Sequence, residues 1–225
     1  MKPIIIAIDG PVGAGKGTIA KFLAQQLSFP YIDSGLLYRY YAYRTEGNCG
    51  HGAASKEEGA AEKDFFEPLW HYFRTKEDLH QLIPLLKKET CGNAASKISR
   101  QLQVRVQVMA AIRRFAQKDS LVIDGRDTTT IIFPDASVKF FVTARPDVRA
   151  KRRLLELEGE QALNDEEKYR AYQTLIEERD ARDSMRPIAP LLQAADAFVL
   201  DTSDVTIDQA QRAALSHVRT VEASL

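Results

Sequence analysis

The chain of 225 residues is long enough for one α/β domain with its own core, and its 31 basic residues balance 31 acidic ones. Duplex nucleic acid and anionic membranes bind proteins with an excess of positive charge. Because this chain has no such excess, we expect neither as a partner. The apolar run before Asp9 is too short for a signal-peptide core or a membrane span, which predicts a cytoplasmic protein. Cys49 and Cys91 belong to no CxxC pair, and we interpret both as reduced thiols in a monomer.

Five short runs rich in β-branched or aromatic residues are typical of buried parallel strands: residues 4–8, 31–32, 121–123, 140–142 and 198–200. Helix-period segments such as 18–27 and 104–115 alternate with them. This alternation predicts a doubly wound α/β fold, in which a five-stranded parallel sheet carries helices on both faces. Because ligands of such sheets bind beyond the carboxyl ends of the strands, four strands followed by Asp or Thr indicate where the site lies.

Two stretches interrupt the alternation, and we interpret residues 40–92 and 149–181 as insertions that cover the site. The rest, residues 1–39, 93–148 and 182–225, then forms the core of a single domain. Within 64–88 the apolar residues recur at helical spacing, which predicts two or three short helices that Pro68 and Pro84 kink or delimit. Residues 47–59 are rich in Gly and small residues, and we predict a mobile loop there.

The strand at 4–8 leads into a glycine-rich turn that opens a helix. Backbone N–H groups in such a turn point inward and, together with the helix N-terminus, cradle phosphate oxygens. The lysine reaches the β- and γ-phosphates, where it stabilises charge that shifts during transfer. The hydroxyl stands one position later than in the strict GxxxxGK[ST] pattern, because a glycine follows the lysine. The predicted phosphate-binding loop, a P-loop, consists of Gly10, Pro11, Val12, Gly13, Ala14, Gly15, Lys16, Gly17 and Thr18.

Asp124 follows the apolar strand at 121–123. In P-loop proteins a carboxylate at such a strand end orients Mg²⁺ or its waters. The functional interpretation of Asp124 competes with an ordinary strand-end turn, and the residue pattern leaves both open.

Ordered segments across most of the chain outside 40–92 resemble the bacterial cytidylate kinases, a branch of the nucleoside monophosphate kinases. The segments are IAIDGPVGAGKGT, YIDSGLLYR, NAAS, DGRD, FPDA, ERDARDSMR, APL and AFVLDTS. The resemblance implies a P-loop NTPase fold in which residues 40–92 are a monophosphate-binding insertion and residues 149–181 are a short lid. It also implies transfer of the γ-phosphate of ATP, which carries Mg²⁺, to CMP or dCMP.

The resemblance further implies a role for individual residues. Ser34, Arg39, Arg126 and Arg186 would hold the CMP phosphate, and Ser96, Arg105 and Asp127 would read the cytosine edge. Tyr38 would pack on the base, while Arg179 and Asp183 would hold the sugar. No metal ion held by the protein alone is expected.

Elementary chemistry agrees with these roles. A carboxylate accepts a hydrogen bond from the exocyclic amine of cytosine, whereas uracil presents a carbonyl there. Arginine donates two bonds to phosphate and stays charged. Because ATP and a monophosphate crowd negative charge into one site, we expect the lid to supply further cations. We therefore expect one or more of Arg149, Arg152 and Arg153 to reach the transferring phosphoryl group, with Lys16 and Arg126.

Three features depart from the usual family pattern. The segment before NAAS looks helical where larger members have a small β-rich insertion with an arginine, and here it offers Lys87 and Lys88. Residues 128–130 are threonines where a glycine is usual, and Cys91 and Gly92 precede NAAS. We therefore expect that recognition of the monophosphate and the conformation of the turn below the base differ from the usual family pattern.

Other functions make different predictions. A P-loop GTPase switch needs an NKxD box and a DxxG motif, and neither string occurs. A catalytically dead nucleotide sensor is disfavoured because Lys16 and the arginines are present. A kinase of UMP or of another small acceptor remains open from the residues alone.

Overall fold

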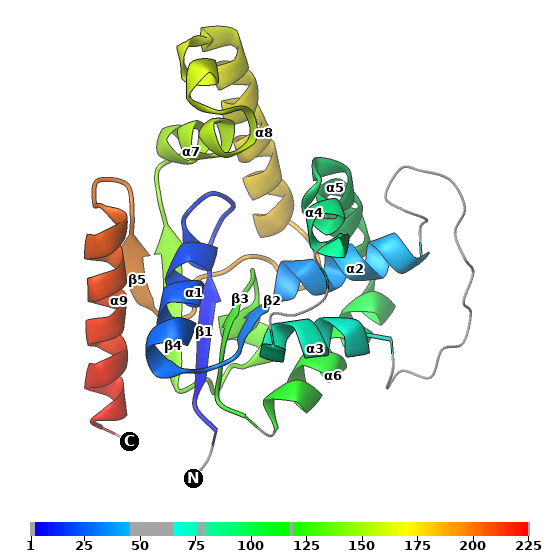
Figure 1. Ribbon diagram of the computed structural model, residues 1–225, viewed down its shortest axis with the longest axis vertical. Helices are drawn as coiled ribbons and strands as arrows, with labels where there is room; N and C mark the ends of the chain where they lie inside the picture. Colours follow the sequence, from blue (N-terminus) through cyan, green and yellow to red (C-terminus); the bar gives the residue numbers. More distant parts are fainter. Residues whose placement is uncertain (1–2, 46–64, 76–78, 80, 118, 225) are drawn as a thin grey trace.

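The computed structural model describes residues 3–45, 65–75, 79, 81–117 and 119–224. Its centre is a five-stranded, fully parallel sheet in the order β2-β3-β1-β4-β5 (Figure 1). The strands are β1 (Ile5–Asp9), β2 (Tyr31–Asp33), β3 (Leu121–Asp124), β4 (Val138–Thr143) and β5 (Phe198–Asp201). All five predicted strands are therefore confirmed, and the sheet places the ends of β1, β2 and β3 side by side.

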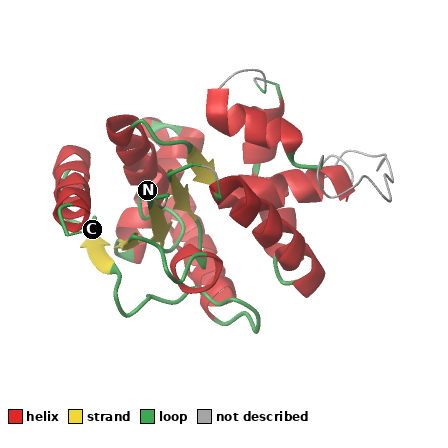
Figure 2. Ribbon diagram, turned by 90° about the horizontal axis from the view of Figure 1, so that it is seen from below, coloured by secondary structure: helices red, strands yellow, loops and turns green. Residues whose placement is uncertain are grey.

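Helices cover both faces of the sheet, as predicted (Figure 2). Alternation along β1 separates two cores, because successive side chains of a strand point to opposite faces. Ile6 and Ile8 pack with α1 (Lys16–Leu27) and α9 (Ile207–Glu222). Ala7 belongs to the other core, with α2 (Ser34–Thr45), α3 (Glu67–Thr75) and α6 (Leu102–Ala116). The buried strands are thus apolar on both sides.

The described part of the 40–92 segment is mostly helical. It contains α3, α4 (Leu82–Lys87) and the start of α5 (Glu89–Ile98), and the prediction of helices in 64–88 is confirmed for the described part of that range. Pro68 and Pro84 lie in the first turns of α3 and α4, where a missing N–H costs no intrahelical bond. Trp70 stacks on Phe115 of α6 at 5.0 Å and packs the segment against the core. The predicted loop at 47–59 lies outside the described residues.

The 149–181 segment lies within a helical hairpin formed by α7 (Pro146–Glu158), a 3₁₀ turn (Glu160–Asn164) and α8 (Glu166–Ser184). The hairpin rises above the carboxyl edge of the sheet (Figure 1). The predicted boundaries at 39/40, 92/93, 148/149 and 181/182 all fall inside helices. Both insertions therefore continue helices that begin or end in the core.

One sequence-based interpretation is wrong. Cys91 is buried in α5 and takes part in a disulfide, whereas the sequence predicted a reduced thiol. Disulfide formation depends on how closely the fold brings two cysteines together, which spacing along the chain does not reveal. Cys49 lies outside the described residues.

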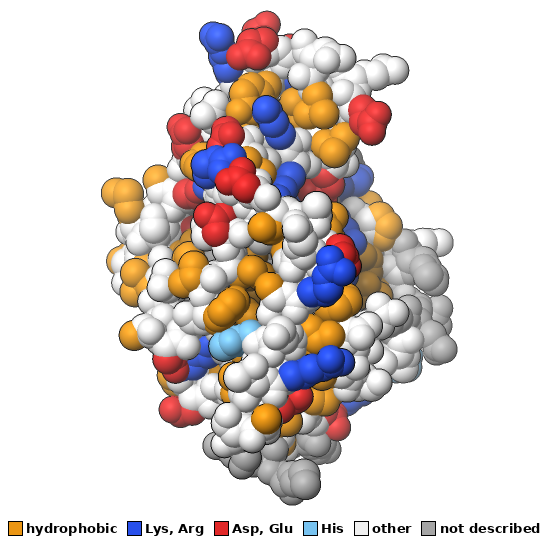
Figure 3. Space-filling model, turned by 90° about the vertical axis from the view of Figure 1, so that its left-hand side faces the viewer, with side chains coloured by type: hydrophobic (Ala, Val, Ile, Leu, Met, Phe, Trp, Pro, Cys, Tyr) orange, Lys and Arg blue, Asp and Glu red, His pale blue; other side chains and the backbone are white. Residues whose placement is uncertain are grey.

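The surface agrees with the balanced composition. On the face that Figure 3 draws, basic and acidic side chains of the described residues are interspersed. No helix in the described ranges is long and apolar enough to cross a bilayer.

Candidate active site

The P-loop joins β1 to α1 in the predicted place. Gly10 has φ 148°, and a Cβ there would stand 1.9 Å from the carbonyl oxygen of Val142 in β4. Only glycine lets the loop pass that close to the neighbouring strand. Gly15, with φ 92°, precedes α1, and its carbonyl accepts from the N–H groups of Thr18 and Ile19 at 3.1 Å. The loop thus ends on a helix N-terminus, as phosphate binding requires.

Lys16 is buried within the loop, and its Nζ donates to the carbonyl of Pro11 at 2.7 Å. Burial, together with the charge of Arg126, lowers the pKa of this amine to about 7, while Asp124 and Asp9 oppose the shift. A nearby anion such as phosphate would restore its charge.

Two cavities meet at Lys16, which lines both together with Gly13, Gly17, Arg153 and Glu156. The first, of about 320 Å³, is here called the arginine-lined cavity. The predicted substrate residues that line it are Ser34, Tyr38, Arg39, Ser96, Arg126, Asp127, Arg179, Asp183 and Arg186. The second, of about 470 Å³, is the Thr202 cavity, bounded by the P-loop, Arg152, Thr202 and the start of α9. One lysine thus faces two adjoining binding volumes.

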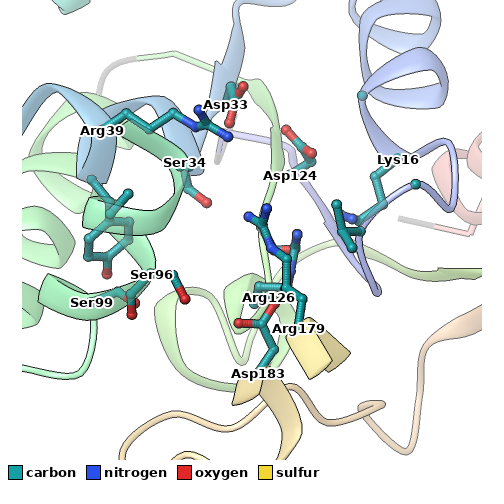
Figure 4. A pocket seen from close by; sticks show the side chains of 18 of the residues that line it. Lys16, Asp33, Ser34, Arg39, Ser96, Ser99, Asp124, Arg126, Arg179 and Asp183 are labelled. Carbon is teal, nitrogen blue, oxygen red and sulfur yellow. Dashed lines mark hydrogen bonds and ion pairs between the residues drawn. The ribbon is translucent and has the colours of Figure 1, made fainter. Parts of the chain in front are cut away.

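Two carboxylates end neighbouring strands beside Lys16 (Figure 4). Asp33 and Asp124 are register partners at the ends of β2 and β3, and both line the arginine-lined cavity. Asp124 accepts from the Tyr31 hydroxyl at 2.8 Å. Burial and the charge of Asp33 together raise the pKa of Asp124 to about 7, while Lys16 opposes the shift. This oxygen-rich pair suits a hard cation held partly through water.

A cluster of guanidinium groups lies opposite these carboxylates. Arg126 and Arg179 lie close together beside Asp183 (Figure 4), and Arg126 Nε donates to Asp183 Oδ2 at 2.9 Å. Burial and the charge of Arg126 together lower the pKa of Arg179 to about 10. The buried Nε of Arg179 has no hydrogen-bond partner among the described residues. Such crowded, incompletely satisfied cations are suited to an anionic ligand.

Arg39 lines the same cavity from α2, but its guanidinium is engaged with the main chain. Its NH1 group donates to the carbonyls of Leu86 at 2.8 Å and Lys88 at 3.0 Å. Arg39 therefore also holds α2 against the end of α4. Its predicted phosphate role stays a prediction.

Asp127 stands between two arginines at the other end of the cavity. It accepts from Arg105 NH2, and Arg186 NH2 approaches its other oxygen at 3.4 Å. Arg105 does not itself line the cavity but also donates to the carbonyl of Ser99 at 3.0 Å, which fixes it behind Asp127. The Tyr38 hydroxyl is buried there without a partner in the described structure, and burial raises its pKa to about 12. Asp127 therefore keeps a fixed orientation beside a neutral phenol.

The three lid arginines have different surroundings. Arg149 is buried, bonds the carbonyls of Ala144 and Val12, and pairs with Asp180 at 2.6 Å, so it lines neither cavity. Arg152 lines the Thr202 cavity and donates to Thr202 Oγ1 at 2.9 Å. Arg153 lines both cavities. Among the three, Arg153 is thus the one that faces the junction where transfer would occur.

Sequence reasoning assigned no role to several residues that shape the site. Asp33, Glu89, Glu156 and Thr202 either line a cavity or hold a residue that does, and Asp9 contacts Thr128 and Thr129 beneath it. Asp33 was recognisable as one of the polar residues that follow a strand. Glu156 pairs with Arg153 one turn away on the same helix, whereas Glu89, Thr202 and Asp9 form their contacts across long sequence separations that no local motif reveals.

Comparison with known proteins agrees with this geometry. The family model described as cytidylate kinase matches residues 6–220. The cytidylate kinase of Pectobacterium atrosepticum is 36% identical and covers 96% of each chain. That of Acidiphilium cryptum is 40% identical and covers 98% of this chain and 97% of its own. A crystal structure of an uncharacterized protein from Eubacterium ventriosum shares the fold, with a TM-score of 0.55 at 16% identity over 96% of this chain and 98% of that chain.

A P-loop that ends on a helix, a cavity lined by arginines and a full-length match to these relatives lead to one assignment. The chain belongs to the cytidylate kinase family.

Proposed function

We propose that this protein transfers the γ-phosphate of ATP to CMP or dCMP. The observation that carries the proposal is Asp127, a buried carboxylate that lines the same cavity as Lys16 and is flanked by Arg105 and Arg186. A fixed carboxylate accepts from the exocyclic amine of cytosine and repels the carbonyl that uracil presents at the same position. Ser96 and Tyr38 line the cavity with Asp127 and supply further polar contact and a ring face for the base.

The acceptor phosphate is proposed to bind among Ser34, Arg39, Arg126 and Arg186, and Arg179 is proposed to hold the sugar with Asp183. Arginine forks suit this phosphate because they donate two bonds at once and keep their charge when buried. Asp183 is fixed by Arg126 at 2.9 Å, and its carboxylate would accept a hydrogen bond from a sugar hydroxyl. Positioning of this kind supplies most of the catalysis in phosphoryl transfer.

ATP is proposed to place its phosphates on residues 10–18 and its nucleoside in the Thr202 cavity. Lys16 lines both cavities and would stabilise the charge that shifts between donor and acceptor. Mg²⁺ would arrive with ATP, and the oxygens of Asp33 and Asp124 fit it directly or through water. Its chemistry is to offset phosphate charge and hold the reacting groups in line.

Arg153 is the strongest candidate for a lid residue at the transferring phosphoryl group, because it lines both cavities. Arg152 is proposed to act on the ATP side, where it contacts Thr202. A monomeric state and a cytoplasmic location stay predictions of the sequence.

The direct test measures ADP formation from ATP and Mg²⁺ with CMP, dCMP, UMP, AMP or shikimate as acceptor. We expect CMP and dCMP to give the highest kcat/KM, at least about tenfold above UMP, because a base-edge mismatch leaves acceptors facing each other. The exposed lid variant Arg170→Ala serves as a control and should behave as the parent. A higher kcat/KM for UMP, AMP or shikimate would contradict the proposed specificity.

A further inference from the structure

Asp9, the last residue of β1, is fully buried and is held by one short turn. The N–H and hydroxyl of Thr128 donate to its Oδ1 at 2.9 and 2.6 Å. The N–H and hydroxyl of Thr129 donate to its Oδ2 at 2.7 and 2.6 Å. Burial raises the pKa of this carboxyl, and these four bonds oppose the shift. Both carboxylate oxygens are therefore fixed by residues some 120 positions away in the chain.

The two ends of this contact belong to different halves of the site. Asp9 directly precedes Gly10, the first residue of the P-loop that carries Lys16. Thr128 and Thr129 directly follow Arg126 and Asp127, and they begin the π-helical turn Thr128–Ile132. The contact therefore links the loop proposed for the donor phosphates to the turn proposed for the acceptor.

The surrounding backbone leaves this turn little freedom. Gly125 N donates to the carbonyl of Ile8 at 2.9 Å, beside Asp9. A Cβ on Gly125 would stand 2.5 Å from Ser34 Oγ and 2.7 Å from Thr128 Cγ2. The turn is thus packed against both Ser34 and β1, and a shift at Asp9 would be transmitted to Arg126 and Asp127.

We propose that Asp9, Thr128 and Thr129 form a positioning clasp that sets the separation between the P-loop and the Arg126–Asp127 turn. These three residues would touch neither substrate; they would act through Lys16, Arg126 and Asp127. Misplacement of reacting groups by about 1 Å costs on the order of 100-fold in rate, so a fixed separation matters more for transfer than for binding either substrate. The inference rests on the proposed function, because it assigns donor and acceptor to the two sides of the clasp.

The threonine hydroxyls make the clasp testable without altering the backbone. Thr129→Val keeps the side-chain shape and removes one donor to Asp9, and Thr129→Ser restores that donor. Thr130→Val is the matched control, because Thr130 lies on the same turn and its buried hydroxyl has no hydrogen-bond partner in the described structure. Both Thr→Val substitutions remove a buried hydroxyl, but only Thr129→Val removes a hydrogen bond.

We expect Thr129→Val to lower kcat at least about tenfold while the separate Kd values for CMP and for a non-hydrolysable ATP analogue change less than about threefold. Thr129→Ser should recover most of kcat, and Thr130→Val should stay within about twofold of the parent. If kcat of Thr129→Val matches that of Thr130→Val, the clasp does not position the substrates. If kcat falls and both Kd values rise together, the hydroxyl only supports the fold, and the proposal is equally overturned.

A second measurement is independent of substrate turnover. Hydrogen exchange of the amides in residues 127–133 should be faster in Thr129→Val by at least about tenfold and unchanged in Thr130→Val, because the hydroxyl bond restrains the turn. Equal exchange rates in Thr129→Val and Thr130→Val would overturn the clasp proposal, even if both variants are active enzymes. If the parent protein does not phosphorylate CMP, the proposed function fails, whereas the exchange comparison still decides whether Thr129 ties this turn to Asp9.

Discussion

Glu89, the first residue of α5, and Arg153 of α7 form an ion pair with 2.8 Å between Glu89 Oε2 and Arg153 NH2. The pair joins the 40–92 segment to the helical hairpin across a separation of 64 residues. Arg153 also pairs with Glu156 on its own helix at 2.9 Å. Arg153, which lines both cavities, is thus held by one partner from α5 and one from its own helix.

Because Glu89 is half-exposed, its pair with Arg153 should contribute a small, salt-dependent effect. We expect Glu89→Gln to lower kcat/KM for CMP about three- to tenfold at low ionic strength, and less at about 0.5 M salt. Steady-state kinetics at the two salt concentrations measure this. Glu166→Gln is the control, since it removes an exposed ion pair with Arg170 within α8 and leaves the partners of Arg153 unchanged. An unchanged kcat/KM for CMP in Glu89→Gln would show that the link to α5 is unimportant.

The lowered pKa of Lys16 predicts a pH dependence for ATP use. Burial favours the neutral amine, and its pKa of about 7 means that the free enzyme loses the lysine charge as pH rises above 7. We expect kcat/KM for ATP to fall above this pH, while kcat at saturating ATP stays constant to higher pH because bound phosphate favours the charged form.

Lys16→Ala should abolish this pH dependence. It should also lower turnover at least about a hundredfold and leave much of the ATP affinity, since the charge matters most in the transition state. Pre-steady-state turnover and ATP titration separate the two effects. Near-normal turnover in this variant would refute the P-loop assignment.

The buried carboxylate of Asp124 should lower the stability of the fold at high pH and yet be needed for activity. Its pKa is raised to about 7 by burial and by Asp33, so between its ordinary value and pH 7 the folded state binds more protons than the unfolded state. The free energy of unfolding from this group therefore falls as pH rises through that window. We expect Asp124→Asn to raise Tm at pH 8 by roughly 2–4 °C and to lower turnover at least about tenfold at limiting Mg²⁺.

Thermal unfolding at pH 5 and pH 8 tests this, with Asp119→Asn as the control. Asp119 has an exposed side chain that pairs with Arg74 at 3.7 Å, so its substitution should change neither property. A lower Tm at pH 8 for Asp124→Asn would show that its charge stabilises the fold.

Asp127 should determine the choice of base. Asp127→Asn replaces one acceptor by an amide that can also donate, so it removes the advantage of the cytosine amine and admits the uracil carbonyl. We expect kcat/KM for CMP to fall at least about a hundredfold and that for UMP to stay constant or rise. Parallel assays with the two acceptors measure the ratio. Equal losses would mean that Asp127 does not read the base.

Arg126 provides the contrasting prediction, because a phosphate contact does not distinguish bases. Arg126→Ala should raise KM for the monophosphate and lower kcat together, by on the order of 2–4 kcal/mol, equally for CMP and UMP. It also leaves Asp183 without its 2.9 Å partner, which adds to the loss. Kinetics indistinguishable from the parent would place the acceptor phosphate elsewhere.

The sequence was sufficient for features that depend on local pattern. The apolar strand, the glycines and the helix start around Lys16 predict a P-loop because neighbouring residues decide its conformation. The helical period in 64–88 predicts helices because one face of each must be buried. Motif order then brings Ser34, Arg126 and Asp127 to one edge, since parallel strands end there.

Tertiary structure alone decided which partner each charged side chain meets. Arg149 and Arg153 are one turn apart on α7, yet one is buried against Ala144 and Asp180 while the other lines both cavities. Thr128 and Thr129 find Asp9 only because β3 pairs with β1 in a particular register. The contacts of Asp9 depend on the packing of elements more than a hundred residues apart, and the residues around either partner contain no record of that distance.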